Sequence, residues 1–267
     1  MTDGDSNAAD ETAGQTTVLK LGGSVITQKD ARETIDDDAL NRAVAAVADA
    51  SRDRRRGGTH DRLVIVHGGG SFGHPNAVDH GVSRTAGTAD AAATMAIHGA
   101  MTTLAYAVVE RLQNAGVPAL PVHPLSVGAR DGTGGLSLPT NVVETMLGEG
   151  FVPILHGDVI AHVGAGTTIV SGDELVVELA VGLDADRVGL CSTVPGVLDA
   201  EDEVIDRIDD YDAVEAVLGG SDATDVTGGM AAKVRTLLDL DAPASIFGPA
   251  ELSGFLSGES VGTVIDG

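Results

Sequence analysis

Cysteine and tryptophan are almost missing from this chain of 267 residues, which has one cysteine, Cys191, and no tryptophan. A single cysteine cannot form a disulfide framework within the chain, and it supplies no cysteine cluster for a zinc ion. A signal peptide is not expected either, because residues 1–15 are polar and acidic and lack its basic start and apolar core. We expect these residues to be a disordered leader, and no apolar run to be long enough to span a bilayer. The expected location is the cytoplasm, without membrane contact.

Positive charge is scarce as well. The chain has 16 lysine and arginine residues against 40 aspartate and glutamate residues, which gives a formal net charge of −24. A nucleic acid would be repelled by such a surface, and no basic stripe exists in the sequence, so we expect no nucleic-acid partner. The acidic residues are spread along the chain, and aromatic residues make up only 2%. This spread favours adaptation to high salt over a single acidic partner-binding surface.

Only three of the positive residues are lysines, and each lies in or beside a glycine-rich segment. Lys20 stands just before Gly22-Gly23, Lys29 follows on the same segment, and Lys233 comes one helical turn after Gly228-Gly229. An ammonium group beside a backbone turn without side chains supplies what a phosphate group needs, namely amide donors and a mobile positive charge. The sequence therefore predicts an enzyme that handles phosphate groups.

Short apolar runs alternate with helix-like segments along the chain. The expected strands cover residues 16–21, 62–67, 119–122, 151–156, 187–191, 245–247 and 263–265, with a hairpin over 159–170. The expected helices cover residues 39–51, 88–114, 140–147, 174–183, 211–218 and 228–240, and residues 123–138 are expected to be irregular. This order predicts one α/β domain over residues 16–267, with an open, mainly parallel sheet covered by helices on both faces. In such sheets ligands bind at the carboxyl ends of the strands, where most glycine clusters of this chain fall.

The segment from Gly68 to Gly73 matches the dinucleotide-binding pattern G-x-G-x-x-G after a strand. That pattern needs a helix that starts within it and an acidic residue about twenty positions on, at the tip of the next strand. Pro75 and Asn76 interrupt the expected helix, and the region twenty residues on is itself expected to be helical. A dinucleotide site is therefore disfavoured, and a P-loop is excluded because its motif does not occur.

Two side chains near the glycine segments are candidates for chemistry. His74 ends the glycine loop, where its imidazole could donate a hydrogen bond to an anionic oxygen. Asp173 could orient the lysines or a metal ion, and it could equally be the N-cap of the helix that follows. His156 stands at a strand end and could simply cap the strand. Three further histidines are expected to be surface or packing residues: His60, His80 and His98.

Five motifs, in chain order, resemble those of the amino acid kinase superfamily and, within it, the isopentenyl phosphate kinase group. They are KLGGSVITQK from Lys20, HGGGSFGHP from His67, HGD from His156, SGD from Ser171, and DVTGGM from Asp225 with Lys233 after it. The first and last motifs are typical of the superfamily. The Ser-Phe-Gly-His ending at His74 and the second lysine, Lys29, are typical of the isopentenyl phosphate kinase group, and fosfomycin kinases share the histidine.

The resemblance implies a three-layer α/β/α sandwich, usually dimeric, with a lobe at about residues 16–170 for the phosphate acceptor and a lobe at about residues 171–267 for ATP. It implies acceptor contacts from Gly69, His74, Gly157 and Asp158. It implies ATP contacts from Lys20, Gly22, Gly23, Ser24, Gly70, Thr193, Gly196, Gly229 and Lys233. The catalytic residues it implies are Lys20, Lys29, His74 and Asp173, with Lys29 neutralising the transferring phosphoryl group. Mg²⁺ would accompany ATP, with no protein metal ligand assigned.

The implied reaction is ATP-dependent phosphorylation of isopentenyl phosphate, a step in isoprenoid precursor synthesis, and its chemistry fits the residues. A phosphate monoester is ionised near neutral pH and needs no general base. Repulsion between two polyanions opposes the reaction, so positioning and electrostatic stabilisation must supply the catalysis. The apolar tail needs a slot, which the helix with Met95, Ile97, Met101 and Leu104 could supply, although core packing would explain each of these residues.

Other functions stay open from the sequence alone. A kinase of the same fold could act on fosfomycin, on UMP or on an amino-acid carboxylate. A non-catalytic nucleotide-binding protein of this fold would bind ATP without turnover, although the presence of both Lys20 and Lys29 argues against it. A dinucleotide-dependent oxidoreductase would bind NADH.

Overall fold

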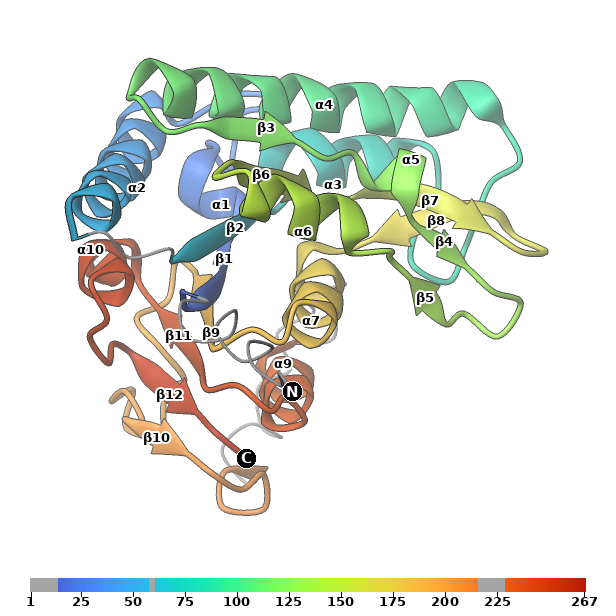
Figure 1. Ribbon diagram of the computed structural model, residues 1–267. Helices are drawn as coiled ribbons and strands as arrows, with labels where there is room; N and C mark the ends of the chain where they lie inside the picture. The colour runs from blue at the N-terminus through green and yellow to red at the C-terminus, as the bar shows by residue number, and fades with distance from the viewer. Residues whose placement is uncertain (1–13, 58–60, 216–228) are drawn as a thin grey trace, which may run out of the picture.

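One large sheet organises the protein, whose computed structural model describes residues 14–57, 61–215 and 229–267 (Figure 1). Its eight strands lie in the order β10-β12-β11-β9-β1-β2-β6-β3. Their bounds are β1 Thr16–Leu21, β2 Arg62–His67, β3 Ala119–Pro121, β6 Val152–His156, β9 Arg187–Cys191, β10 Arg207–Ile208, β11 Ala244–Phe247 and β12 Thr263–Ile265. Every neighbouring pair is parallel except β11 with β12, so the prediction of a mainly parallel sheet is confirmed.

The helices cover both faces of this sheet (Figure 1). Their bounds are α1 Gly23–Ile26, α2 Asp37–Gly57, α3 Gly70–Asp79, α4 Ala91–Asn114, α5 Pro124–Val127, α6 Asn141–Gly148, α7 Gly172–Gly182, α9 Gly229–Leu238 and α10 Leu252–Leu256, with a 3₁₀ turn at Pro249–Glu251. The predicted helices that fall on α2, α4, α6, α7 and α9 are confirmed. Part of the helix predicted at 211–218, the segment 225–228 and most of the acidic leader lie outside the described residues.

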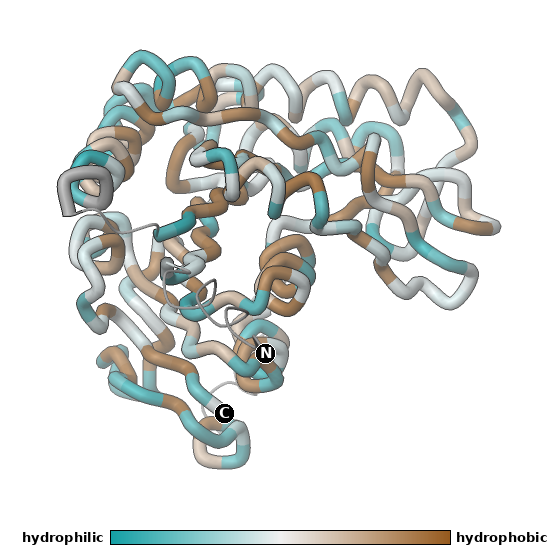
Figure 2. Tube along the Cα trace, viewed as in Figure 1, coloured by the Kyte–Doolittle hydropathy of each residue, from teal (hydrophilic) through white to brown (hydrophobic). Residues whose placement is uncertain are grey.

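Two hydrophobic cores form on opposite faces of the sheet, because alternate residues of a strand point to opposite sides. Val18 and Val64 belong to the core that includes α6 and α7. Leu19 and Ile65 belong to the core that includes α2 and α4. Figure 2 shows α7 as a largely hydrophobic segment in the middle of the molecule. Since Lys20 follows the same alternation as Val18, strand β1 directs it toward α7.

A second, smaller sheet extends from the carboxyl edge of the first, in the order β5-β4-β7-β8. Its strands are β4 Ala129–Arg130, β5 Leu136–Ser137, β7 Asp158–His162 and β8 Gly166–Val170. The antiparallel pair β7 and β8 is the predicted hairpin. The expectation that residues 123–138 are irregular was wrong, because they contain α5, β4 and β5. These elements span only two to four residues, too few to show a hydrophobic period.

The glycine segment after β2 begins helix α3, which corrects the expectation that Pro75 would prevent a helix there. Proline has no N–H group, so the carbonyl of Ser71, four residues earlier, loses its helical donor. The Glu33 N–H replaces that donor, 3.0 Å from the Ser71 oxygen. His74 therefore lies within a helix and not at the end of a loop. The dinucleotide pattern still fails, because the region twenty residues on leads into α4 and not into a strand.

Helix α4 is long and apolar, which corrects the expectation that no apolar run could span a bilayer. Its 24 residues and a mean hydropathy of 1.4 would allow it to cross a membrane by length and composition alone. Half of this apolar stretch is buried inside the molecule, where Met101 and Leu104 join the core beside α2. The core helix of a globular protein passes the same test, so this finding is weak evidence for a membrane segment.

Candidate active site

The carboxyl ends of β1 and β2 are neighbours, and the glycine turns that follow them touch backbone to backbone. A Cβ atom placed on Gly23 would lie 2.1 Å from the Gly70 nitrogen, and one on Gly68 would lie 2.6 Å from the Gly23 nitrogen. No side chain fits at either position, so glycine is required by the close approach. The two turns open α1 and α3, whose first amide groups have no acceptor within their own helices.

Thr27 ties these two turns together. Its hydroxyl donates to the Gly23 carbonyl at 2.9 Å and accepts the Ser71 N–H at 3.1 Å. Gly70 lies between them with φ of +47°, in the left-handed region that favours glycine. A Cβ atom there would lie 2.1 Å from the Thr27 hydroxyl oxygen. The predicted site residues Gly23 and Gly70 are therefore brought together as parts of one unit.

Lys20 reaches from β1 to the first turn of α7. Its Nζ atom lies 2.6 Å from Asp173 Oδ1, and the two side chains are 14% and 25% exposed. A Cβ atom on the neighbouring Gly172 would lie 3.3 Å from Lys20 Cε, so the start of α7 leaves little room beside the lysine stem. A charge-assisted hydrogen bond of this length holds the ammonium in one place. The structure pairs Asp173 with Lys20, and the role of Asp173 in orienting this lysine for catalysis stays a prediction.

Asp173 is not the N-cap of α7, which corrects the alternative reading of this residue. Ser171 is the N-cap, and its hydroxyl accepts the Glu174 N–H at 3.2 Å. Glu174 in turn accepts the Ser171 N–H at 3.0 Å, which completes a capping box. The sequence carries the corresponding S-x-x-E pattern, and it was overlooked. Because two other residues cap the helix, the Asp173 carboxylate is left for Lys20.

Lys29 and His74 lie on neighbouring segments. The chain that follows α1 folds over α3, where Asn76 Nδ2 donates to Glu33 Oε1 at 2.8 Å and the Glu33 N–H donates to the Ser71 carbonyl. These contacts bring the segment that carries Lys29 alongside the helix that carries His74. Both side chains are exposed, so both are accessible to an anion from solvent.

Gly157 and Asp158 follow β6 at the same edge of the sheet. The Gly157 N–H donates to the His67 carbonyl at 3.0 Å, so this amide is already engaged in the link between β2 and β6. Asp158 is buried, with 2% of the residue exposed. Its carboxylate accepts hydrogen bonds from His98 Nδ1 at 2.9 Å and from the Leu125 N–H at 3.3 Å. Asp158 therefore fixes α4 and α5 beside the site, and its carboxylate does not face solvent.

Two buried histidines, which sequence reasoning did not assign to the site, end β2 and β6. The rings of His67 and His156 are stacked with their centroids 5.5 Å apart. Nδ1 of His67 lies 3.1 Å from the Gly68 oxygen, and Nδ1 of His156 lies 3.0 Å from the Gly157 oxygen. A carbonyl can only accept, so each Nδ1 carries the proton. The repeated His-Gly pair at two strand ends was the signal available in the sequence.

Burial lowers the pKa of both inner rings, His67 and His156, to about 4. Both are therefore neutral near pH 7. His123 Nδ1 lies 2.9 Å from His156 Nε2, and burial followed by the nearby His98 lowers the pKa of His123 as well. His98 differs, because its hydrogen bond to Asp158 raises its pKa. His98 is thus a packing residue, as expected. Its carboxylate partner, Asp158, was not expected.

Four of the residues expected to bind ATP lie after the carboxyl ends of β1 and β9, which are neighbouring strands. Gly22 donates its N–H to the Cys191 carbonyl at 2.9 Å, and Ser24 is exposed in α1. Thr193 is exposed in the turn after β9. Gly196 is buried in the same turn, and a Cβ atom there would lie 2.7 Å from Thr263 Oγ1, so packing against β12 alone requires a glycine.

Gly229 and Lys233 stand in the first turns of α9, which packs against α7. Gly229 has φ of +68°, again in the region that favours glycine. The Thr227-Gly228 part of this motif lies outside the described residues. The helix that carries Lys233 is thus a direct neighbour of the helix that carries Asp173.

The side chains considered for an apolar slot on α4 do not form one surface. Met95 is 55% exposed, whereas Leu104 is fully buried in the core beside α2. Ile97 belongs to a separate small cluster with Val82 and Val159, between α3 and β7. Met101 contacts the glycine segment, because a Cβ atom on Gly73 would lie 2.9 Å from its sulfur. Core packing therefore accounts for Leu104 and Met101.

Comparison with known proteins places this arrangement in a family. The model of the amino acid kinase family matches residues 15–240. Isopentenyl phosphate kinase of Haloferax volcanii is 61% identical over 250 residues, which cover 94% of this chain and 98% of that protein. Isopentenyl phosphate kinase of Methanocaldococcus jannaschii is 31% identical over 94% of this chain and 98% of that protein. A crystal structure of an isopentenyl phosphate kinase superposes with a TM-score of 0.77 at 27% identity, covering 95% of this chain and all of that one.

The buried histidine at the end of β2 makes stability depend on pH. The pKa of His67 falls from about 6.5 in the unfolded chain to about 4 in the fold. Its contribution to stability is therefore complete above about pH 6.5 and is lost as the pH falls toward 4. His67→Asn keeps a donor for the Gly68 carbonyl and removes the titrating ring. We expect the free energy of unfolding to fall less steeply in this variant, by up to about 1.4 kcal/mol per pH unit.

Denaturant unfolding between pH 4.5 and 7.5 at constant salt measures this slope. His80→Asn, at the exposed end of α3, is the matched control for loss of a histidine. Parallel curves for the wild type and His67→Asn would show that His67 does not govern the pH dependence.

Proposed function

The chain belongs to the amino acid kinase family, and on that premise we propose that ATP phosphorylates isopentenyl phosphate to isopentenyl diphosphate at the glycine-lined edge of its sheet. The reaction is a phosphoryl transfer, and the protein is a phosphotransferase like its relatives from Haloferax and Methanocaldococcus. One observation carries the proposal for the site. The ammonium of Lys20 is fixed 2.6 Å from Asp173 beside two touching glycine turns, where a phosphate can meet amide donors and a positive charge together.

The acceptor needs no activation by a base, because a phosphate monoester carries its nucleophilic oxygen in ionised form. The task of the protein is to hold two polyanions in line and to neutralise the charge between them. We assign this neutralisation to Lys20, Lys29 and Lys233, which lie on β1, after α1 and on α9. Lys20 is held in place before the substrates arrive, whereas Lys29 is exposed and can move with the phosphoryl group.

The acceptor half of the site is assigned to about residues 16–170 and the ATP half to about residues 171–267. The residues proposed for the acceptor, Gly69, His74 and Gly157, follow β2 and β6. The ATP half is built from α7, α9 and the turn after β9. Asp158 contributes to the acceptor half through the packing of α4 and α5, since its carboxylate is bound by His98 and Leu125.

Mg²⁺ is proposed to enter as the MgATP complex. Among the described residues, no three His, Cys, Asp or Glu side chains are grouped so that they could hold a metal ion. Asp173 is already paired with Lys20. Mg²⁺ commonly keeps water ligands and binds through substrate phosphates. The residues present therefore fit a metal carried by the nucleotide and do not fit a resident metal centre.

The acceptor is tested by measuring ATP consumption in molar potassium chloride, with and without Mg²⁺. High salt is used because the net charge of −24 indicates adaptation to it. We expect turnover with isopentenyl phosphate and Mg²⁺, and none with UMP, fosfomycin or acetylglutamate. Turnover with another acceptor alone would keep the family and overturn the substrate. ATP binding without turnover would make the protein a non-catalytic member of the family.

The roles of Lys29 and His74 are separated by two alanine variants. Lys29→Ala removes a charge that acts on the transferring group, so we expect kcat to fall about 10²- to 10³-fold with little change in KM. His74→Ala removes a donor to the bound acceptor, so we expect the acceptor KM to rise about tenfold or more with the ATP KM unchanged. Steady-state kinetics in both substrates measures the two effects, and each variant is the control for the other. The reverse pattern would exchange the two assignments.

We propose that the protein is a homodimer that uses the exposed side of α4. Met95 and Tyr106, eleven residues apart and so on one helix face, are 55% and 56% exposed. Large exposed apolar side chains grouped on one face are typical of an interface. We expect sedimentation equilibrium to give a dimer for the wild type and a monomer for Met95→Glu/Tyr106→Glu. Val163→Glu, on the 67% exposed Val163 of the β7–β8 turn, is the control and should stay dimeric. A monomeric wild type would contradict the proposal.

A further inference from the structure

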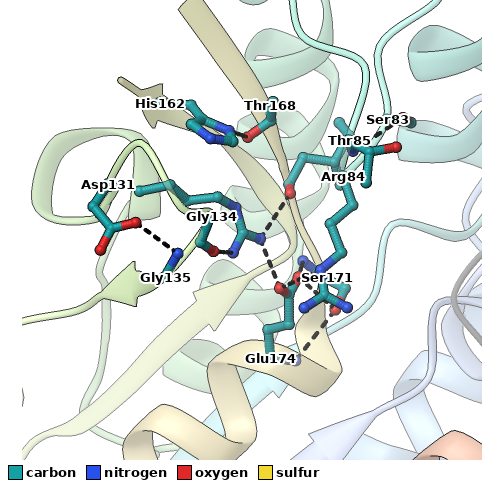
Figure 3. Close-up of polar contacts among 12 residues, drawn as sticks. Ser83, Arg84, Thr85, Asp131, Gly134, Gly135, His162, Thr168, Ser171 and Glu174 are labelled. Carbon is teal, nitrogen blue, oxygen red and sulfur yellow. Dashed lines mark hydrogen bonds and ion pairs between the residues drawn. The ribbon is translucent and has the colours of Figure 1, made fainter. Parts of the chain in front are cut away.

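Glu174, the residue after Asp173, collects two guanidinium groups from distant parts of the chain (Figure 3). Arg130 Nη2 lies 2.7 Å from Glu174 Oε1, and Arg84 Nε lies 2.9 Å from the same oxygen. The other oxygen of Glu174 accepts from the Ser171 N–H at 3.0 Å and from the Ser171 hydroxyl at 3.1 Å. One carboxylate therefore closes the helix cap and receives both arginines.

Arg130 is the buried member of this pair. It is only 3% exposed, and besides Glu174 its guanidinium donates to the Ile169 carbonyl at 3.1 Å and to the Gly134 carbonyl at 3.2 Å. These acceptors lie on β8, on the turn after β4 and on α7. Arg130 therefore fixes the junction between β8 and α7 from the side of the small sheet.

The turn that carries the Gly134 carbonyl is held by hydrogen bonds to Asp131, and Figure 3 shows the one from Gly135. Asp131 Oδ1 accepts from the N–H groups of Thr133 and Gly135 at 2.8 and 3.0 Å, and from the Thr133 hydroxyl at 2.7 Å. These hydrogen bonds lower the pKa of Asp131. A carboxylate with this many donors holds the turn in one conformation. Arg130 is thus anchored at its base before it reaches α7.

We propose that Arg130 is a positioning residue that acts through Glu174 to hold the first turn of α7 where Asp173 fixes Lys20. The inference rests on the proposed role of the Lys20–Asp173 pair in phosphoryl transfer. Asp173 Oδ1 lies 2.6 Å from Lys20 Nζ, and a Cβ atom on Gly172 would lie 3.3 Å from Lys20 Cε, so a shift of this turn moves the ammonium directly. Displacement of a catalytic group by about 1 Å can lower a rate about 10²-fold.

Arg84 offers a matched comparison, because it binds the same Glu174 oxygen from an exposed position. Its side chain is 67% exposed, against 2% for Arg130. An exposed ion pair is screened by water and contributes little. Removal of a buried partner leaves the Glu174 carboxylate poorly compensated. Burial raises the pKa of the neighbouring Glu178, Glu174 adds to this rise and Arg130 opposes it, so loss of Arg130 raises that pKa further. Burial, and not charge alone, therefore distinguishes the two arginines.

The test is a set of variants of the full chain assayed with isopentenyl phosphate and MgATP in molar potassium chloride. We expect Arg130→Gln to lower kcat roughly ten- to a hundredfold with KM for both substrates changed less than about threefold. Arg84→Gln should change kcat less than about twofold. Arg130→Lys keeps the charge and should restore part of kcat. Unfolding midpoints are measured for each variant, and assays are run well below them.

A double-mutant cycle with Asp173→Asn separates positioning from general structural damage. If Arg130 acts through Asp173, Arg130→Gln should lower kcat less than about twofold further in the Asp173→Asn background, whereas it should act in full in the His74→Ala background. If Arg130→Gln does not fold, Arg130→Gln/Glu174→Gln removes both charges and keeps a glutamine for the capping box. The same loss of kcat is then expected.

Two failures can be told apart. Full additivity with Asp173→Asn, or an effect on KM alone, overturns the inference about Arg130. An unchanged kcat in Asp173→Asn overturns the proposed role of the Lys20–Asp173 pair, and with it the premise of the inference. Equal effects of Arg84→Gln and Arg130→Gln would also overturn the inference about Arg130, because the exposed arginine would then matter as much as the buried one.

Discussion

The backbone contact between the glycine turns after β1 and β2 is the constraint on which the site depends. With Gly23 and Gly70 in direct contact and Thr27 bonded to both turns, α1 and α3 begin at one point of the sheet. Lys20 lies on β1, two residues before the first of these turns. An added methyl group at Gly23 would push the two turns apart. Glycine here is a requirement of packing before it is a requirement of binding.

Electrostatics explains why two cations, Lys20 and Arg130, are tightly held. A chain with a net charge of −24 repels the two polyanions it brings together, so positive charge must be concentrated at the site. Lys20 is restrained by Asp173 and Arg130 by Glu174, and the two carboxylates are consecutive at the start of α7. Both lie at the helix end where negative side chains are stabilised. The acidic residues beside the site thus hold the cations in place.

Most strands of the large sheet and the longer helices were predictable from the sequence, because buried runs and helical length are local patterns. The strands β4, β5 and β10 were missed, since each spans only two residues. Helix α3 was missed because the donor that replaces the Pro75 N–H comes from Glu33, a residue 42 positions earlier. The histidine cluster and Arg130 were missed for the same reason, since their partners lie on other strands and helices. A side chain's burial is a tertiary property, and no periodicity in a single segment contains it.

The position of β1 in the middle of the sheet has a consequence for biosynthesis. It pairs with β2 from residue 62 but also with β9, which ends at Cys191. During synthesis at about 5–20 residues per second, one edge of this apolar strand stays open until most of the chain has emerged. Lys20 likewise waits for Asp173. Contacts of such long sequence separation slow folding. While β1 waits for β9, the nascent chain exposes an unpaired strand edge that can pair with other chains. Chaperones would protect the chain from aggregation during this time.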